Sequence, residues 1–258
     1  MHALGLSTGP DVEAGAVLDR LLPHLETTGT VGLVKVGATA AERTVYELDD
    51  ETWSARGAGL DPEDALSKLA VEHDYAVAVG FPEADLPQVA VGDAPVEDPA
   101  VSASAPGDLD LDAVDEAIAD SEPIETLDSL IARVKESNLE AQAGAIATFT
   151  GRVRAKEGPD DDPTEALTFE KYEGVAAERM AAIEAELEDW DGVLDVEMHH
   201  KVGRIERGED IVFVVVLAGH REEAFEAVEA GINRLKDEVP IFKKESTVEE
   251  EFWRHERP

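Results

Sequence analysis

Four positively charged side chains gather around a proline in the stretch RLKDEVPIFKKES (234–246). Arg234, Lys236, Lys243 and Lys244 occur there although the chain has 59 acidic and only 22 basic residues. A lysine held among other cations, away from water, has a lowered pKa and can act as a nucleophile or a base. Alternatively, Lys236 only complements the dipole of a helix end, and Arg234 and Lys244 pair with acids. The stretch predicts a site for an anion, with a lysine as candidate catalyst.

A second group of cations lies where a predicted strand meets a predicted helix. His220 and Arg221 stand at that junction, where the free amides of a helix N-terminus favour anions. Arg154 closes another predicted strand, and 15 of the 22 lysines and arginines lie from residue 151 onward. For Arg221 alone, an ordinary helix start with a solvated arginine is the alternative. Arg154, Arg221, Lys236 and Lys243 together favour an anion-binding site.

The residue inventory disfavours three other kinds of site. The chain has no cysteine, which excludes disulfides, thiolate metal ligands and a cysteine nucleophile. It has no His-Glu-x-x-His motif, and the adjacent His199 and His200 would point to opposite faces of a strand. No Gly-x-Ser-x-Gly sequence supports a Ser-His-Asp triad. We therefore expect no metal site.

The net charge of the whole chain disfavours some kinds of binding partner. A formal charge of −37 over 258 residues disfavours nonspecific binding to nucleic acid or to an anionic membrane. Acidic residues are spread along the chain, so we interpret them as adaptation to a cytoplasm of high salt, where repulsion is screened. No apolar stretch reaches the ~20 residues that span a bilayer, and no signal peptide is evident. We expect a cytoplasmic protein without a membrane span.

Composition predicts two domains joined by a linker. In residues 1–94, apolar strand candidates at 2–7, 31–37 and 75–81 alternate with an amphipathic helix at 12–26, which predicts a small α/β domain with a largely parallel sheet. Residues 95–121 are acidic and rich in alanine and proline, and we expect a linker there.

Residues 122–258 have a different pattern, which predicts an α+β domain with a mixed sheet. Its helices are predicted at 124–137, 175–190 and 222–238, and its strands at 143–153, 166–172, 193–203 and 210–219.

Motifs of this second part occur in a fixed order: TFTGRVR (148–154), LTFEKYEG (167–174), HHKVGRIERGEDIVFVVVLAGHREEAFEA (199–227) and LKDEVPIFKKE (235–245). Together they resemble the large, catalytic subunit of molybdopterin synthase, the MoaE family, over residues ~122–258. The resemblance implies an α+β fold of the α/β-hammerhead type.

The resemblance also implies an activity and its partners. The family adds two sulfurs to cyclic pyranopterin monophosphate, which forms the dithiolene of molybdopterin. The sulfur arrives on a small ubiquitin-like partner, as a C-terminal Gly-Gly thiocarboxylate. Large subunits form a homodimer with a small subunit at each end, a heterotetramer. No bound cofactor is implied, because the pterin is the substrate.

Matching the motifs residue by residue gives each candidate a role. Lys236 and Lys243 correspond to the family's catalytic lysines: Lys236 would stabilise charge or move protons at the reacting carbon, and Lys243 would steer the thiocarboxylate. Arg154, His220 and Arg221 would hold the phosphate and the pterin, some of them across the dimer interface.

The N-terminal part resembles, faintly, the accessory P-loop protein of molybdenum cofactor dinucleotide synthesis, the MobB type. A working P-loop is Gly-x4-Gly-Lys-Ser/Thr, whereas the segment Gly9 to Gly15 is one residue too long and is followed by Ala16 and Val17. We therefore expect no GTP hydrolysis, and a docking or dimerising role stays open.

Two functions of different classes remain. The leading one is a sulfurtransferase, the molybdopterin synthase catalytic subunit. The alternative is a non-catalytic adaptor that binds the pterin or the sulfur carrier for a later step. The presence of both Lys236 and Lys243 favours the enzyme, because an adaptor has less need of either.

Overall fold

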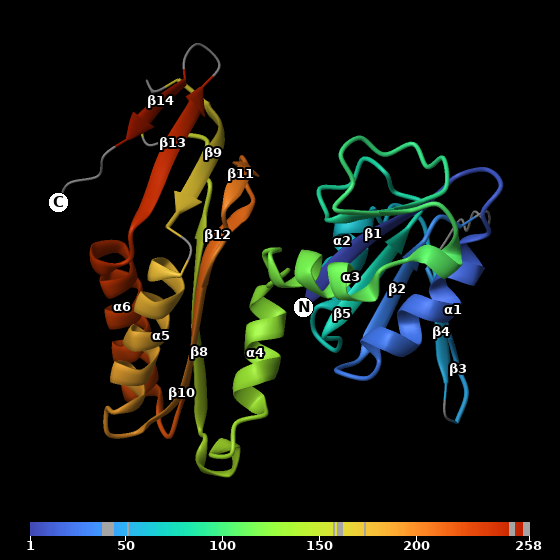
Figure 1. The fold of residues 1–258 in the computed structure, drawn as a ribbon. Coiled ribbons are helices and arrows are strands. Elements are labelled where there is room, and N and C mark those ends of the chain that lie inside the picture. Colours follow the sequence, from blue (N-terminus) through green and yellow to red (C-terminus); the bar gives the residue numbers. More distant parts are fainter. Residues whose placement is uncertain are drawn as a thin grey trace. The chain divides into compact units, whose positions relative to one another are not determined.

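The computed structural model describes residues 1–37, 44–50, 52–156, 158, 162–172, 174–247 and 251–254. The chain forms two compact units, residues 1–126 and residues 127–258 (Figure 1). Within the described ranges, no helix combines the length and the apolar character that crossing a membrane requires.

The first unit is built on a five-stranded sheet in the order β2-β5-β1-β6-β7, with every pairing parallel. Its strands are β1 (His2–Thr8), β2 (Val31–Lys35), β5 (Tyr75–Val79), β6 (Gln88–Val91) and β7 (Val101–Ala103). The central strand β1 is apolar on both faces, as a parallel sheet covered on both sides requires. The expected α/β domain with a parallel sheet is confirmed.

Helices of the first unit bury the two faces of this sheet. α1 (Ala14–Leu25) and α3 (Leu111–Ala119) pack against Leu4 and Leu6, and α2 (Pro62–Leu69) packs near Ala3 and Ala76. β3 (Val45–Leu48) and β4 (Trp53–Arg56) form a separate antiparallel hairpin, which no described residue pairs with this sheet.

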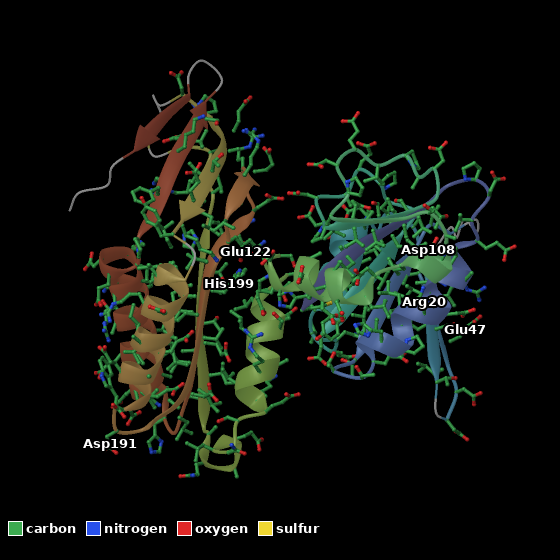
Figure 2. All side chains as sticks on the ribbon, viewed as in Figure 1. Arg20, Glu47, Asp108, Glu122, Asp191 and His199 are labelled. Carbon is green, nitrogen blue, oxygen red and sulfur yellow. The ribbon has the colours of Figure 1, made fainter. Side chains whose placement is uncertain are left out.

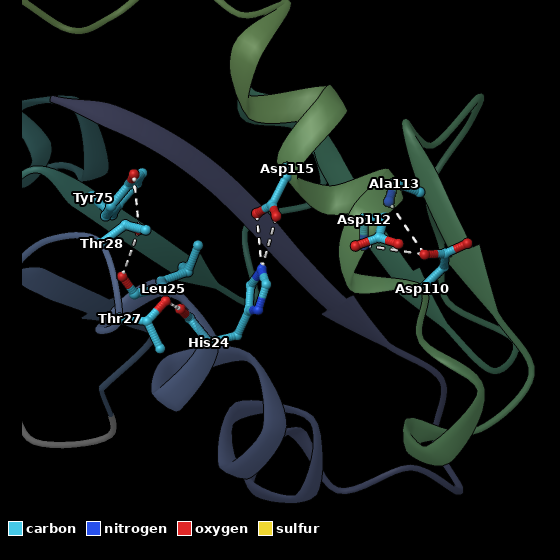
Figure 3. A network of polar contacts seen from close by, with 9 residues as sticks. All are labelled: His24, Leu25, Thr27, Thr28, Tyr75, Asp110, Asp112, Ala113 and Asp115. Atoms are coloured by element: carbon cyan, nitrogen blue, oxygen red, sulfur yellow. Dashed lines mark hydrogen bonds and ion pairs between the residues drawn. The ribbon is translucent and has the colours of Figure 1, made fainter.

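The linker expected at residues 95–121 is corrected by the structure, because this segment is part of the first unit. It contains β7 and α3, and it contributes Val101, Val114 and Ile118 to the core. Asp110 caps α3 by accepting hydrogen bonds from two backbone amides of its first turn. His24 Nε2 lies 2.9 Å from a carboxylate oxygen of Asp115, which joins α1 to α3 (Figure 3). Composition suggested flexibility, but four-residue spacing of apolar side chains allowed burial.

The second unit contains a three-stranded antiparallel sheet in the order β10-β12-β8. Its strands are β8 (Ala145–Arg152), β10 (Val193–His200) and β12 (Asp210–Ala218). α4 (Leu127–Lys135) covers one face, and α5 (Val175–Glu188) and α6 (Arg221–Glu238) cover the other (Figure 1). Residues 211–218 of β12 are all buried, since both faces of this central strand are covered.

A second sheet of this unit has the order β11-β9-β13-β14, again with antiparallel pairing. Its strands are β9 (Thr164–Lys171), β11 (Gly203–Glu206), β13 (Ile241–Thr247) and β14 (Glu251–Arg254). The mixed sheet expected for this unit is thus replaced by two antiparallel sheets among the described residues. The physical reason is that α5 and α6 each connect strands of different sheets, so neither forms the crossover that parallel neighbours require.

Candidate active site

A cavity of about 1100 Å³ lies in the second unit, with walls from β8 and β12 of one sheet, β9 and β13 of the other, and the C-terminal end of α6. Much of the wall is apolar, with side chains from all of these elements: Phe149, Leu167, Phe169, Ile211, Val212, Leu235, Val239, Ile241 and Phe242. Such walls suit a flat organic ring and exclude water from polar groups set among them.

The charge of this cavity opposes the charge of the chain. Arg152, Arg154, Lys236 and Lys243 line it, whereas Glu245 is the single carboxylate among the described lining residues. A cationic cavity with low-dielectric walls concentrates anions more strongly than the same cations would on an open surface. In a protein of net charge −37 the arrangement therefore selects for an anionic ligand.

Lys236 is placed by the packing of α6. Its neighbour Leu235 is buried in the core, while Lys236 is exposed and lines the cavity. The helix ends at Glu238, because Val239 is extended (φ −89°, ψ 124°) and precedes Pro240. The chain then turns directly into β13, which returns Lys243 to the cavity that Lys236 lines.

Lys243 is placed by the alternation of β13. Ile241, Lys243 and Glu245 share one face of that strand, and all three line the cavity. Lys243 pairs across the sheet with Phe169 of β9. The Glu245 carboxyl group is buried and accepts a hydrogen bond from the hydroxyl of Thr164, which fixes its position in the cavity wall.

Arg154 enters the same cavity from beyond the end of β8. Val153 is buried, and its amide donates to the Glu209 carbonyl, which fixes the backbone just before the arginine. Arg152 lies 3.0 Å from Asp210 through its Nε, so its charge is partly neutralised. The structure thus brings Arg154, which follows β8, to the same cavity as Lys236 of α6 and Lys243 of β13.

His220 and Arg221 do not lie at this cavity. They stand at the first turn of α6, and sixteen residues separate His220 from Lys236, roughly 24 Å along a helix axis. The amide of Gly219 donates to the Gly192 carbonyl at 2.8 Å, which holds the start of α6 against the turn after Asp191 (Figure 2). His220 and Arg221 are both exposed, so within one chain they face solvent at the opposite end of the helix.

His200 is a cavity residue that sequence reasoning rejected only as a metal ligand. It is buried at the end of β10 and lines the cavity. His199, which Figure 2 labels, is half-buried and does not line the cavity. Burial lowers the pKa of His200 to about 4, and the charge of Lys171 acts in the same direction. Among the described residues, no group of three histidine, aspartate or glutamate side chains could hold a metal ion.

Comparisons with known proteins identify the family of this chain. Residues 120–238 match the MoaE protein family. A probable molybdopterin synthase of Haloferax volcanii is 50% identical over 266 residues, covering 100% of both chains. The molybdopterin synthase catalytic subunit of Bacillus subtilis is 39% identical over 132 residues, covering 51% of this chain and 79% of its own length. The solved structure of molybdopterin synthase from Staphylococcus aureus is 32% identical, covers 52% of this chain and 93% of its own, and has a TM-score of 0.45.

The family match contains four of the five site residues predicted from the sequence. It spans Arg154, His220, Arg221 and Lys236, and it ends before Lys243. The Haloferax relative extends the similarity over both units, so the first unit is also shared with a synthase. The chain therefore belongs to the MoaE family of molybdopterin synthase catalytic subunits.

Proposed function

We propose that the cavity of the second unit is where this sulfurtransferase converts cyclic pyranopterin monophosphate to molybdopterin. The sulfur donor is the C-terminal Gly-Gly thiocarboxylate of a small ubiquitin-like partner. The observation that carries the proposal is the cluster of Arg154, Lys236 and Lys243 in an apolar cavity of a strongly acidic chain. Substrate phosphate and thiocarboxylate are both anions, and the flat pterin suits apolar walls.

Each of the three cations has its own role in this proposal. Arg154 holds the phosphate, because its planar guanidinium can donate two parallel hydrogen bonds. Lys236 stabilises negative charge or moves a proton at the reacting carbon, and Lys243 steers the thiocarboxylate. Each transfer forms one carbon–sulfur bond on the pterin and breaks a carbon–oxygen bond at the same carbon, whose oxygen leaves as water or stays on the phosphate as the cyclic ester opens. Water cleaves the bond between the partner's acyl carbon and the sulfur, which leaves an ordinary carboxylate on the partner.

His220 and Arg221 serve this site from a second copy of the chain. They lie too far from Lys236 along α6 to reach the same cavity in one chain, and both are exposed at the helix start. In a homodimer, with a small subunit on each large one, they would reach the partner copy's cavity and complete its phosphate or pterin contacts. We place this heterotetramer in the cytoplasm, which the cysteine-free, acidic composition suits.

The test is sulfur transfer at high salt. The full chain is mixed with a thiocarboxylated small partner and cyclic pyranopterin monophosphate, and molybdopterin is measured. We expect product that depends on all three components. If the small partner and the pterin both bind but no molybdopterin forms, the enzymatic function is wrong and a non-catalytic adaptor is favoured.

We propose that the first unit is a degenerate P-loop-like domain of the MobB type. A glycine-containing loop after β1 leads into α1, where a P-loop would lie. Gly15 falls inside α1, and Ala16 and Val17 replace the lysine and hydroxyl residues that hold phosphate and magnesium. In addition, the Val12 side chain packs against Gly92 at this edge of the sheet. We expect no GTP turnover by the full chain, and measurable turnover would overturn this assignment.

A further inference from the structure

His200 is a buried imidazole in the cavity wall whose orientation is fixed from two sides. Its ring meets the ring of Phe169 edge to face, with centroids 4.8 Å apart and an interplanar angle of 71°. Its Nδ1 lies 2.7 Å from the backbone carbonyl oxygen of Lys201. Phe169 belongs to β9 and Lys201 directly follows β10, so the ring is held from both of the sheets that form the cavity.

The contact with Lys201 determines the tautomer. A carbonyl oxygen only accepts hydrogen bonds, so Nδ1 must carry the proton and donate it. A neutral ring protonated at Nδ1 has a bare lone pair at Nε2, the nitrogen farther from the strand. No hydrogen bond joins Nε2 to another of the residues that the structure describes. Among the described lining residues, the hydroxyls of Thr150 and Thr164 can donate or accept, whereas Nε2 of His200 is neutral and can only accept.

A neutral group that only accepts differs from the other polar side chains of the described lining. Arg152, Arg154, Lys236 and Lys243 can only donate, and Glu245 is the one charged acceptor among the described lining residues. The cations favour a ligand with an anionic group. A fixed neutral acceptor favours a hydrogen-bond donor on the same ligand, and an N–H of a heterocycle is such a donor without added charge.

We propose that His200 is a substrate-positioning residue whose Nε2 accepts a hydrogen bond from a ring or exocyclic N–H of the pterin, while the cations hold its phosphate. This inference rests on the proposed function, since that function supplies the pterin. The two interactions fix the ligand at two points, which orients the reacting carbon toward Lys236. The low pKa of His200 keeps the ring neutral at working pH, so the acceptor persists beside the cations.

The test compares binding of cyclic pyranopterin monophosphate and of inorganic phosphate to the full chain at high salt. His200→Phe keeps a ring against Phe169 but removes the acceptor, and we expect about tenfold weaker pterin binding with unchanged phosphate binding. His200→Gln can place an amide oxygen near the position of Nε2 and should recover most of the affinity. His199→Phe makes the same exchange on the other face of β10 and should match the wild type.

A direct readout comes from nitrogen NMR of the histidines in the wild-type chain. In the unliganded protein we expect the His200 ring to carry its proton on Nδ1 and to have an unprotonated Nε2. The chemical shift of Nε2 should change when pterin binds. The proposal is overturned if His200→Phe binds the pterin as tightly as wild type, or if its affinity for inorganic phosphate falls by the same factor as its affinity for the pterin. It is also overturned if Nε2 of the unliganded wild type is already hydrogen-bonded to the protein. Wild-type molybdopterin formation is assayed alongside: its absence despite His200-dependent pterin binding would count against the proposed function alone.

Discussion

Lys236 and Lys243 reach one cavity by different means, and this difference makes them separable by substitution. Lys236 is an exposed residue of the last turn of α6, and no described residue forms a hydrogen bond or ion pair with it. Lys243 lies within β13 between two paired strands, with further contacts of its own. Removal of the Lys236 ammonium should therefore affect chemistry with almost no effect on folding.

We expect Lys236→Ala to lower kcat/KM for molybdopterin formation by roughly a hundredfold or more, because a charge positioned at the reacting atoms is lost. The Tm should stay within about 2 °C of wild type, as for other exposed sites. Lys244→Ala is the matched control, since Lys244 is adjacent to Lys243 on the opposite face of β13 and does not line the cavity. Full activity of Lys236→Ala would show that its proposed role is wrong.

For single residues, the sequence predicted the cations of the cavity but not the neutral His200 and the acidic Glu245 beside them. Lysines were conspicuous because the chain has few of them, and Pro240 marked the turn between Lys236 and Lys243. Glu245 is one of 59 acidic residues, so its type carried no signal until the strand placed it beside Lys243. For His200 the available signal was strand alternation, which separated it from His199 but could not show which face was the cavity wall.

Among the elements, α5 has an unusual contact with the edge strand β10. The carboxylate of Glu184 accepts a hydrogen bond from the Met198 amide at 2.7 Å, and Glu188 accepts one from the Val196 amide at 3.1 Å. Alternate amides on the outer edge of a strand would otherwise be free to pair with another chain. Two carboxylates four residues apart on one helix therefore close this edge.

Burial of these carboxylates predicts a pH dependence. Burial raises the pKa of Glu184 from 4.5 to about 7, nearby Glu197 and Glu188 add to the rise, and the Met198 amide opposes it. The folded state therefore binds more protons than the unfolded chain between about pH 4.5 and 7, and its stability falls as pH rises through that window. At pH 8, Glu184→Gln should raise stability by roughly 1 to 3 kcal/mol, or several degrees in Tm.

The control for this prediction is Glu178→Gln, an exposed change on the same helix, which should leave the pH profile of Tm as in wild type. At pH 5 the Glu184→Gln and wild-type proteins should be similar, because Glu184 is then mostly protonated. A Glu184→Gln profile that still falls between pH 5 and 8 as steeply as wild type would contradict the assignment.

The positions of most helices and strands in the second unit could be predicted from the sequence, whereas the pairing of strands into sheets could not. Three- and four-residue spacing located α5 and α6, and the apolar run at 210–219 located β12. β13 was missed because its Lys-Lys-Glu run has no apolar alternation, and it is a strand because β9 pairs with it. Sheet membership depends on contacts between distant segments, which local periodicity does not contain.

For the whole molecule, a net charge of −37 predicts that folding depends on salt. Self-repulsion of the compact state is screened within about 3 Å at 1 M ionic strength, against about 10 Å at 0.1 M. We expect Tm to rise by roughly 10 °C or more between 0.1 M and 3 M KCl. Sucrose at matched osmolality should reproduce only a small part of the rise, and an equal effect of sucrose would argue against screening.

Dimerisation predicts that catalytic residues can be exchanged between copies. If Arg221 acts in the partner copy's cavity, Lys236→Ala and Arg221→Ala each inactivate their homodimer, but a mixed dimer contains one cavity with both residues intact. Random assembly makes half of the dimers mixed, so co-expressed subunits should recover roughly a quarter of wild-type activity.

The matched control for this exchange is a mixture of Lys236→Ala with Lys243→Ala. Both of these residues line the same cavity of one chain, so every cavity of a mixed dimer still lacks one lysine and no activity should return. Recovery in the first mixture but not in the second would place Arg221 in the site of the other copy. If neither mixture recovers although tagged subunits co-purify, Arg221 does not act across the interface. The exposed start of α6 would then need another explanation for its histidine and arginine.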